Sequence, residues 1–345
     1  MMNKPIKRAL FAAAVISVGI FSTVNSAKAL EKVRTDSITA YTGFTIYAAK
    51  ELGLFKKYGI DTDPKWYPSG APIIQAAAAN AWDITFLGAP PAALGGPKLG
   101  LVTVGMIVED AGTQELIGRP DFVAKIKKNP QALRGAKIFV TSLSVGDYMT
   151  EACLRKVGLT QSDVKIIPSE QQATLSAFIA GYGDLAQVWS PQSTALKDRG
   201  DVVYCNATET NLSMPAVWIV NSKFAANPKN RKTIINWLKA NLAAVNWLLA
   251  DRKRAFNLYK KYDKYRGFNF SDKLLHDEVN LVMSTYMGLT DQLKMLSKGP
   301  DGIAPIVKSF DGIAKFYIRR GRMKKVPDYS KVIDASYLQA IASGE

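Results

Sequence analysis

Apolar runs alternate with polar turns and amphipathic stretches through the first two thirds of the chain. In the first part, short runs rich in β-branched and aromatic residues predict strands at 33–39, 60–67, 83–87 and 101–108. Helices are predicted at 46–52, at 73–79 and from Pro90 to about Gly95-Gly96. This alternation is typical of a parallel sheet with helices on its faces, so we predict an α/β fold.

A second alternating unit follows between Asp121 and Cys205. Its strands are predicted at 138–140, 164–167, 184–188 and 202–204, and its helices at 122–133, 147–157, 169–180 and 191–198. A strand at 216–220 returns toward the first unit. Nearly all of the remaining chain has helical spacing, at 228–249, 251–262, 271–287, from 291 onward and at 303–320. Five large side chains of this region are expected to pack rather than bind anything: Met283, Met287, Met295, Trp237 and Trp247.

Four predicted strands run into turns of small or hydroxyl-bearing residues that open a helix. These turns are Tyr41–Thr45, Ser69–Pro72, Gly88–Pro91 and Thr141–Asp147. In an open α/β sheet, ligands bind outside the carboxyl ends of the strands. In the fourth turn, Thr141, Ser142 and Ser144 offer hydroxyls beside the free N–H groups of a new helix, which suits an anion. A plain N-cap with nothing bound is the alternative for this turn taken alone.

The N-terminal segment has the pattern of a secretory signal peptide. Lys4, Lys7 and Arg8 precede an apolar run at 9–21, and Ala27-Lys28-Ala29 matches a small-x-small cleavage site. The apolar run is shorter than the roughly 20 residues that span a bilayer, which argues against a membrane anchor. We therefore expect cleavage after Ala29 and a mature protein in the periplasm.

The chain has a formal net charge of +16, and loss of the four positive residues of the signal segment leaves +12. Such an excess suits anionic partners, and export argues against nucleic acid. His276 is the only histidine, and together with two cysteines it makes no metal-ligand cluster. The sequence contains no nucleophile elbow, P-loop or dinucleotide fingerprint, so we predict neither an enzyme nor a cofactor.

The two cysteines are Cys153 and Cys205. The first falls in the helix after the fourth turn, and the second at the end of a later strand. An oxidising compartment permits a disulfide, but both positions also suit small buried apolar residues. Whether they pair depends on a geometry that the sequence leaves open.

Short phrases along the chain carry a family resemblance. They lie at 47–55, 59–60, 68–70, 82–84, 133–138, 158–166, 188–191 and 220–224. In order and spacing they resemble the solute-binding proteins of ABC importers for nitrate, aliphatic sulfonates and taurine, including the related thiamine-precursor binders. The resemblance implies a type II periplasmic-binding-protein fold, with two α/β lobes, a central cleft and two crossovers. The first lobe would comprise 30–112 and 217–345 with the C-terminal helices, and the second 113–216, with crossovers near 110–118 and 211–216.

In this family the ligand contacts come from the turns identified above. The matching positions are Tyr41, Thr42, Gly43, Phe44, Ser69, Gly70, Gly88, Ala89, Pro90, Ser142, Ser144, Val145, Gly146, Trp189 and Ser190. Asp110 is added because it or Glu109 would neutralise the amine of a zwitterionic solute. The alternative is that both acids belong to a hinge turn exposed to solvent. Relatives often have an acid or glycine and then Pro-Tyr after the tryptophan, where this chain has Ser190-Pro191-Gln192.

The resemblance implies the extracytoplasmic solute-binding component of an ABC importer. It would be a monomer without catalytic residues, cofactor or metal, and would bind a small organic anion such as an aliphatic sulfonate or taurine. It would then dock on a permease at the inner membrane. The alternatives are a binder of nitrate or of a pyrimidine or thiamine precursor, an enzyme on the same fold, and a sensory binder.

Overall fold

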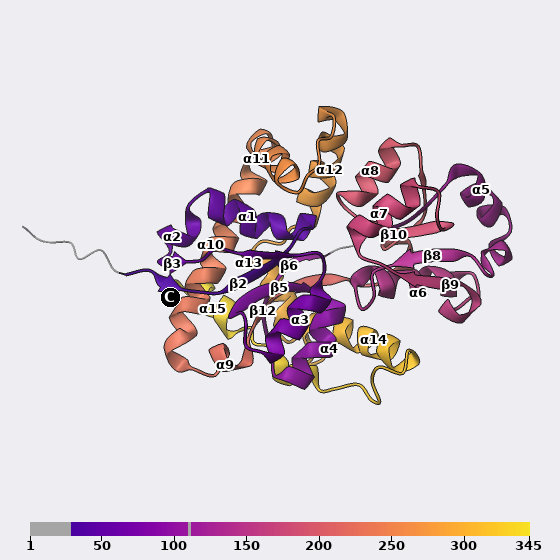
Figure 1. Cartoon of the computed structure of the whole chain (residues 1–345). Coiled ribbons are helices and arrows are strands. Elements are labelled where there is room, and N and C mark those ends of the chain that lie inside the picture. The colour runs from indigo at the N-terminus through magenta and orange to yellow at the C-terminus, as the bar shows by residue number, and fades with distance from the viewer. Residues whose placement is uncertain (1–28, 110–111) are drawn as a thin grey trace, which may run out of the picture.

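Two five-stranded sheets lie side by side in the computed structural model, each flanked by helices (Figure 1). The structure describes residues 29–109 and 112–345. Residues 1–28 of the predicted signal segment and Asp110 therefore lie outside the described residues. We call each sheet with its flanking helices a lobe, and the predicted residue boundaries of the two lobes stay a prediction.

The first sheet combines strands from the first part of the chain with one strand that returns from the second lobe. Its order is β4 (Lys65–Tyr67), β2 (Thr35–Ile38), β5 (Ile84–Gly88), β12 (Pro215–Val220) and β6 (Val102–Glu109). β2 is parallel to β4 and β5, whereas β12 is antiparallel to β5 and β6. The predicted parallel pattern holds for β4, β2 and β5. The whole sheet is mixed, because β12 returns from the second lobe and runs in the opposite direction between β5 and β6.

The second sheet is mixed for the same reason. Its order is β11 (Val202–Asn206), β7 (Gln114–Gly118), β10 (Leu185–Trp189), β8 (Lys137–Val140) and β9 (Lys165–Pro168). β7 is antiparallel to β10 and β11, whereas β8 is parallel to β9 and β10. β7 lies in the segment 110–118, which was expected to be a crossover, yet all of its residues are buried between two strands.

Two further elements differ from the predicted ones. The segment 60–67 is two strands, because β3 (Ile60–Asp61) pairs with β1 (Glu31–Lys32) while β4 joins the main sheet. The helix α4 (Ala89–Leu99) passes through Gly95 and Gly96 and ends at Gly100, which has a φ of 65°. A Cβ on Gly95 would lie 2.5 Å from the Ile74 side chain, so this glycine permits close helix packing rather than ending the helix.

The remaining helices of the two lobes lie in the connections between strands. They are η1 (Tyr41–Gly43), α1 (Phe44–Glu51), α2 (Leu54–Lys57), α3 (Gly70–Ala78), α5 (Pro120–Lys128), α6 (Val145–Lys156), α7 (Gln171–Ile179) and α8 (Gln192–Asp198). These bounds agree with the predicted α/β alternation.

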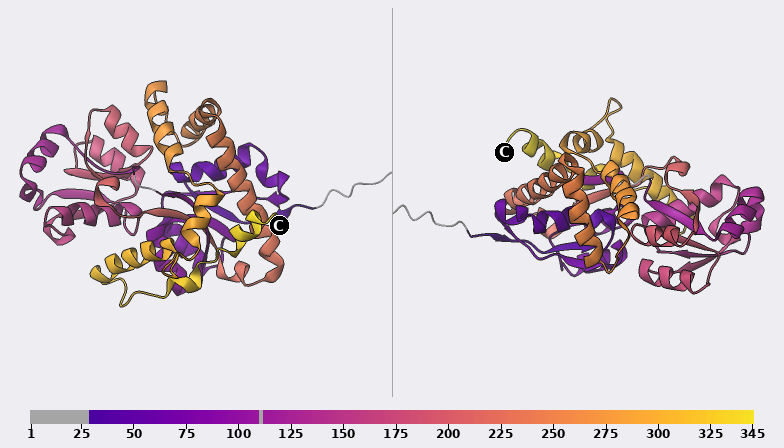
Figure 2. Two further views of the ribbon diagram at one scale, coloured as in Figure 1. Left: turned by 180° about the vertical axis from the view of Figure 1, so that it is seen from behind. Right: turned by 90° about the horizontal axis from the view of Figure 1, so that it is seen from above.

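The C-terminal third is helical, as predicted, and touches both lobes (Figure 2). Its helices are α9 (Ser222–Ala225), α10 (Arg231–Ala250), α11 (Arg252–Tyr265), α12 (Asp272–Thr285), α13 (Leu289–Leu296), α14 (Pro305–Arg319) and α15 (Ser336–Ala342). α10 packs on α1 and α14 on α4 in the first lobe, whereas α12 lies against α8 of the second lobe. No helix in the described part of the chain is long and apolar enough to cross a membrane.

The large side chains singled out in this region do pack in the core. Trp237 and Met283 are buried, and Met287, Met295 and Trp247 are partly buried against the main apolar cluster.

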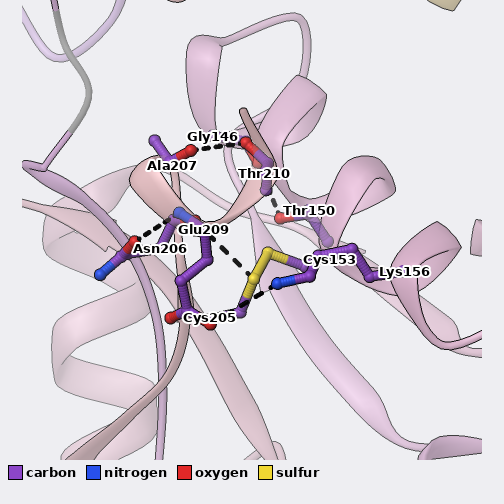
Figure 3. Close-up of a disulfide and its surroundings, with 9 residues drawn as sticks. All are labelled: Gly146, Thr150, Cys153, Lys156, Cys205, Asn206, Ala207, Glu209 and Thr210. Atoms are coloured by element: carbon purple, nitrogen blue, oxygen red, sulfur yellow. Dashed lines mark hydrogen bonds and ion pairs between the residues drawn. A yellow bond between two sulfur atoms is a disulfide. The ribbon is translucent and has the colours of Figure 1, made fainter. Parts of the chain in front are cut away.

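A disulfide joins Cys153 of α6 to Cys205 of β11 (Figure 3). The two residues are 52 positions apart in sequence, and the bond ties the helix to the edge strand of the second sheet. An ion pair between Lys156 and Glu209, at 3.7 Å, lies beside it. The pairing that the sequence left open is therefore settled by the packing of α6 on the sheet.

Candidate functional site

A cavity lies between the two lobes. It is lined by Ile38, Ala40, Tyr41, Thr42, Ser69, Gly70, Phe86, Gly88, Pro91, Gln114, Ser144, Val145, Trp189 and Ala216. Both sheets contribute, because the carboxyl ends of β2, β5 and β10 and the first residues of β7 and β12 meet at the same place. The cavity therefore sits where an α/β sheet commonly binds its ligand.

Half of the residues predicted from sequence line this cavity. They are Tyr41, Thr42, Ser69, Gly70, Gly88, Ser144, Val145 and Trp189. The other described ones, which do not line it, are Gly43, Phe44, Ala89, Pro90, Ser142, Gly146 and Ser190. Asp110 lies outside the described residues.

Several of the predicted residues support the wall of the cavity from behind. Phe44 is fully buried, with its ring 4.8 Å from that of Tyr259. A Cβ on Gly43 would lie 2.3 Å from the Ile38 carbonyl oxygen, and one on Gly146 would overlap the Gln187 side chain. These two glycines allow the turns to approach the sheets closely.

Six lining residues were missed by sequence reasoning, and four of them belong to strands: Ile38, Phe86, Gln114 and Ala216. The other two, Ala40 and Pro91, stand beside the predicted turn residues at the starts of η1 and α4. Ile38 and Phe86 lie at or near the ends of β2 and β5, where an inward side chain of a strand reaches the cleft. Gln114 begins β7, the strand that was not predicted. The period-2 alternation of side chains along β2 and β5 was the signal that could have found the first two.

Two tyrosines from the C-terminal helices hold the first turn in place. The Tyr262 hydroxyl donates to the Ala40 carbonyl oxygen at 2.8 Å, and the Tyr286 hydroxyl donates to that of Tyr41 at 3.1 Å. Burial, as the first cause, raises the pKa of both phenols, so they stay protonated donors at neutral pH.

The hydroxyl protons of the serine turns are already committed within the protein. Ser144 Oγ donates to the Thr141 carbonyl oxygen at 2.7 Å and accepts from the Asp147 N–H at 3.2 Å, which is an N-cap arrangement. Thr141 Oγ1 donates to the Ser169 carbonyl oxygen at 2.9 Å, and Ser142 is exposed outside the cavity. The alternative of a plain N-cap therefore describes Ser144, and the hydroxyls of Thr141 and Ser144 have no proton left to donate to an anion.

Other groups remain to donate hydrogen bonds to an anion. α3 begins at Gly70 and α6 at Val145, and both residues line the cavity from opposite lobes. The first N–H groups of a helix lack intrahelical acceptors, and the dipole makes each N-terminus positive. None of the cavity-lining residues in the described part of the chain is charged.

The lobes touch around the cavity through three kinds of contact. Ser69 Oγ of the first lobe lies 3.1 Å from Glu170 Oε1 at the start of α7 in the second. A Cβ on Gly88 of β5 would lie only 2.7 Å from Cγ2 of Val145 in α6. On the far side, Arg319 of α14 forms an ion pair with Glu151 of α6 at 2.7 Å.

A buried charged cluster joins α11 and α12 to the end of β10. The Arg266 guanidinium pairs with Asp263 and lies 3.8 Å from Glu278, and the side chains of all three are at most 3% exposed. Burial raises the pKa of Asp263 to about 7, and the charge of Arg266 partly offsets this. Glu278 accepts hydrogen bonds from Tyr259, at 2.7 Å, and from Ser190.

Glu109 connects the two segments that link the lobes. Its carboxylate accepts a hydrogen bond from the Met214 N–H at 2.6 Å and one from Ser213 Oγ at 3.2 Å. Glu109 ends β6, and Met214 directly precedes β12. Glu109, which was considered as a partner for a solute amine, thus links one crossover to the other by hydrogen bonds.

The side chains of Cys153 and His276 have structural contacts. Cys153 is in the disulfide, so it has no thiol to act as a nucleophile. His276 of α12 stacks on Phe256 with ring centroids 3.9 Å apart. Among the described residues, no group of three or more His, Cys, Asp or Glu could hold a metal ion.

Comparisons with known proteins agree with this architecture. The family described as NMT1/THI5 like matches residues 41–255. The taurine-binding periplasmic protein of Escherichia coli (strain K12) is 25% identical over 288 residues, 82% of this chain and 86% of that protein.

Two solved structures show the same fold. The periplasmic aliphatic sulphonate binding protein of Escherichia coli has a TM-score of 0.69 at 18% identity, over 88% of this chain and 92% of its own. The periplasmic nitrate-binding protein of Synechocystis PCC 6803 has a TM-score of 0.69 at 14% identity, over 91% of this chain and 89% of its own. The predicted two-lobed periplasmic-binding-protein fold is confirmed.

Proposed function

Because the chain belongs to the NMT1/THI5 like family, we propose that it is the extracytoplasmic solute-binding component of an ABC importer. Its solute is a small organic anion, such as an aliphatic sulfonate or taurine, held in the cavity between the lobes. The taurine and sulphonate relatives support this class of solute. The protein acts by binding and not by catalysis.

The observation that carries the proposal is the pairing of two helix N-termini across an uncharged cavity. α3 and α6 approach from opposite lobes, so an anion between them would accept N–H hydrogen bonds from both. Ile38, Phe86 and Trp189 add an apolar wall, which suits the carbon chain of an organic anion. Nitrate has no apolar part to bury against such a wall.

Closure of the lobes couples binding to transport in this proposal. The solute binds in the open cleft, and the contacts between the lobes form as the cleft closes. A ligand shifts the equilibrium between the open and closed forms only if it binds one form more tightly than the other. A solute that touches both lobes binds the closed form more tightly. The closed monomer then docks on a permease at the inner membrane, after export and cleavage following Ala29.

A thermal-shift screen of the mature protein tests the proposal. The ligands are taurine, ethanesulfonate, nitrate and a pyrimidine, all at the same concentration. A ligand whose dissociation constant is a hundredfold below that concentration should stabilise the protein by about 2.7 kcal/mol. Stabilisation by nitrate or the pyrimidine alone, or by none of the four, would contradict the organic-anion assignment.

A further inference from the structure

Ser69 and Glu170 form a hydrogen-bonded pair between the lobes at the wall of the cavity. Ser69 lines the cavity and is 1% exposed, and Glu170 Oε1 lies 3.1 Å from its hydroxyl. An ionised carboxylate only accepts, so the hydroxyl proton of Ser69 points to Glu170. The lone pairs of Ser69 Oγ remain, and this atom is therefore an acceptor for the cavity.

No cationic side chain in the described part of the chain pairs with the Glu170 carboxylate. No ion pair includes Glu170, and its second oxygen, Oε2, is buried without a hydrogen-bond partner. Glu170 precedes α7, but its side chain caps none of the N–H groups of that helix. Burial raises the pKa of this carboxyl, and the hydrogen bond from Ser69 offsets this rise in part.

Half-burying an ionised carboxylate without a nearby cation costs free energy, unless a bound solute supplies the cation. The cavity next to it has positive helix ends but no charged side chain. A simple alkanesulfonate would leave Glu170 uncompensated and add a second negative charge nearby. A solute with both an anionic end and an ammonium group would place the anion at the helix N-termini and the cation near Glu170.

We propose that the Ser69–Glu170 pair selects a zwitterionic solute, with the ammonium group donating to Ser69 Oγ and the anionic end at the N-termini of α3 and α6. Glu170 is a positioning residue, because it acts through Ser69 by orienting the hydroxyl and supplying negative charge behind it. This inference rests on the proposed function and narrows its solute class from organic anions to amino-substituted ones.

Glu170 also bridges the lobes, so a purely mechanical role has to be separated from solute selection. A bridge that only helps closure would affect every solute alike, whereas an ammonium partner affects only solutes that carry one. The ratio of affinities for two matched probes therefore distinguishes the two roles. Taurine and ethanesulfonate are such probes, because they differ in the ammonium group.

The experiment measures both dissociation constants by isothermal titration for the wild type, Glu170→Gln, Glu170→Asp and Ser69→Ala. Glu151→Gln is the matched control, because it removes an interlobe carboxylate that does not line the cavity. The unfolding temperature of each ligand-free variant shows that it folds.

We expect the wild type to prefer taurine over ethanesulfonate by about tenfold or more, as for a hydrogen bond to a charged group. Glu170→Gln and Ser69→Ala should remove most of this preference, Glu170→Asp should restore part of it, and Glu151→Gln should leave it unchanged. A wild type that binds both probes equally, or a Glu170→Gln variant that weakens both equally, would overturn the inference while leaving the proposed function intact. A folded wild type that binds neither probe overturns the sulfonate assignment and this inference together.

Discussion

The Ser190 hydroxyl, at the end of β10 in the second lobe, donates a hydrogen bond to Glu278 of α12. The two residues are 88 positions apart, and both are buried. The C-terminal helices thus do more than cover the first sheet, because they contact the second lobe directly beside Trp189 of the cavity wall.

Replacing Ser190 with alanine should favour the open form of the protein. Glu278 keeps its bond from Tyr259, at 2.7 Å, so the helices should stay packed while one contact between the lobes is lost. A hydrogen bond from a neutral donor to a charged acceptor contributes about 1.5–3 kcal/mol, here to the stability of the closed form. Ligand affinity should therefore fall roughly tenfold or more. The radius of gyration from small-angle X-ray scattering should rise in the ligand-free protein.

Ser176→Ala is the control, since Ser176 lies exposed on α7 away from the interface. An unchanged affinity and radius of gyration in Ser190→Ala would show that this contact does not bias closure.

Gly88 allows the lobes to close. Its φ is −60°, so the backbone accepts alanine, but a new Cβ would lie 2.7 Å from the branched side chain of Val145. Gly88→Ala should therefore weaken solute binding at least about tenfold while hardly changing the unfolding temperature without ligand, because the clash exists only in the closed form. Isothermal titration and thermal unfolding measure the two quantities.

The double variant Gly88→Ala/Val145→Ala should recover part of the lost affinity, because it removes the clashing methyl groups. If Gly88→Ala binds as tightly as the wild type, the close approach of Gly88 to Val145 is not needed for binding.

Loss of the disulfide should lower the stability of the second lobe. A cross-link between residues 52 positions apart restricts the unfolded chain, and the loop-entropy relation gives about 4 kcal/mol for such a loop. The variant Cys153→Ser/Cys205→Ser should lose a free energy of unfolding of this order in denaturant titration. Dithiothreitol should destabilise the wild type similarly and leave the variant unaffected. Equal stability with and without the reductant in the wild type would contradict a disulfide in the folded protein.

Asp36 should make the protein less stable at high pH. Its side chain is 2% exposed with Oδ2 unpaired, and burial raises its pKa to about 6, partly offset by Lys65. The pKa of an aspartate in the unfolded chain is about 3.9, so the folded protein binds this proton more tightly. Stability should therefore fall as the pH rises from about 4 to about 6, and it should stay low above pH 6. Asp36→Asn should therefore be more stable than the wild type at pH 8 by on the order of 2 kcal/mol.

The difference in unfolding free energy between Asp36→Asn and the wild type should shrink between pH 8 and pH 5. Subtracting the two curves cancels the contribution of other buried acids, such as Asp263. A difference that stays constant over this range would show that Asp36 titrates normally.

Local sequence determined the alternation of strands and helices and the position of the turns that border the cavity. Residues such as Thr42, Gly70 and Val145 were found because turn chemistry and helix starts depend on neighbours a few positions away. A plain N-cap was the alternative for the turn at 141–147, and the structure shows Ser144 in that role, three residues before the predicted helix start. The family resemblance placed these turns on two lobes.

Only the tertiary structure decided which groups meet across long stretches of chain. Ser69 and Glu170 are 101 positions apart, and neither the period of their segments nor their residue types reveals the contact. The strand β7 depends on its two neighbours rather than on its own apolar content, which is why Gln114 was missed. Pairing of Cys153 with Cys205 and the role of Glu109 at the crossovers likewise follow from how the sheets pack, because burial and distance are properties of the fold and not of the local sequence.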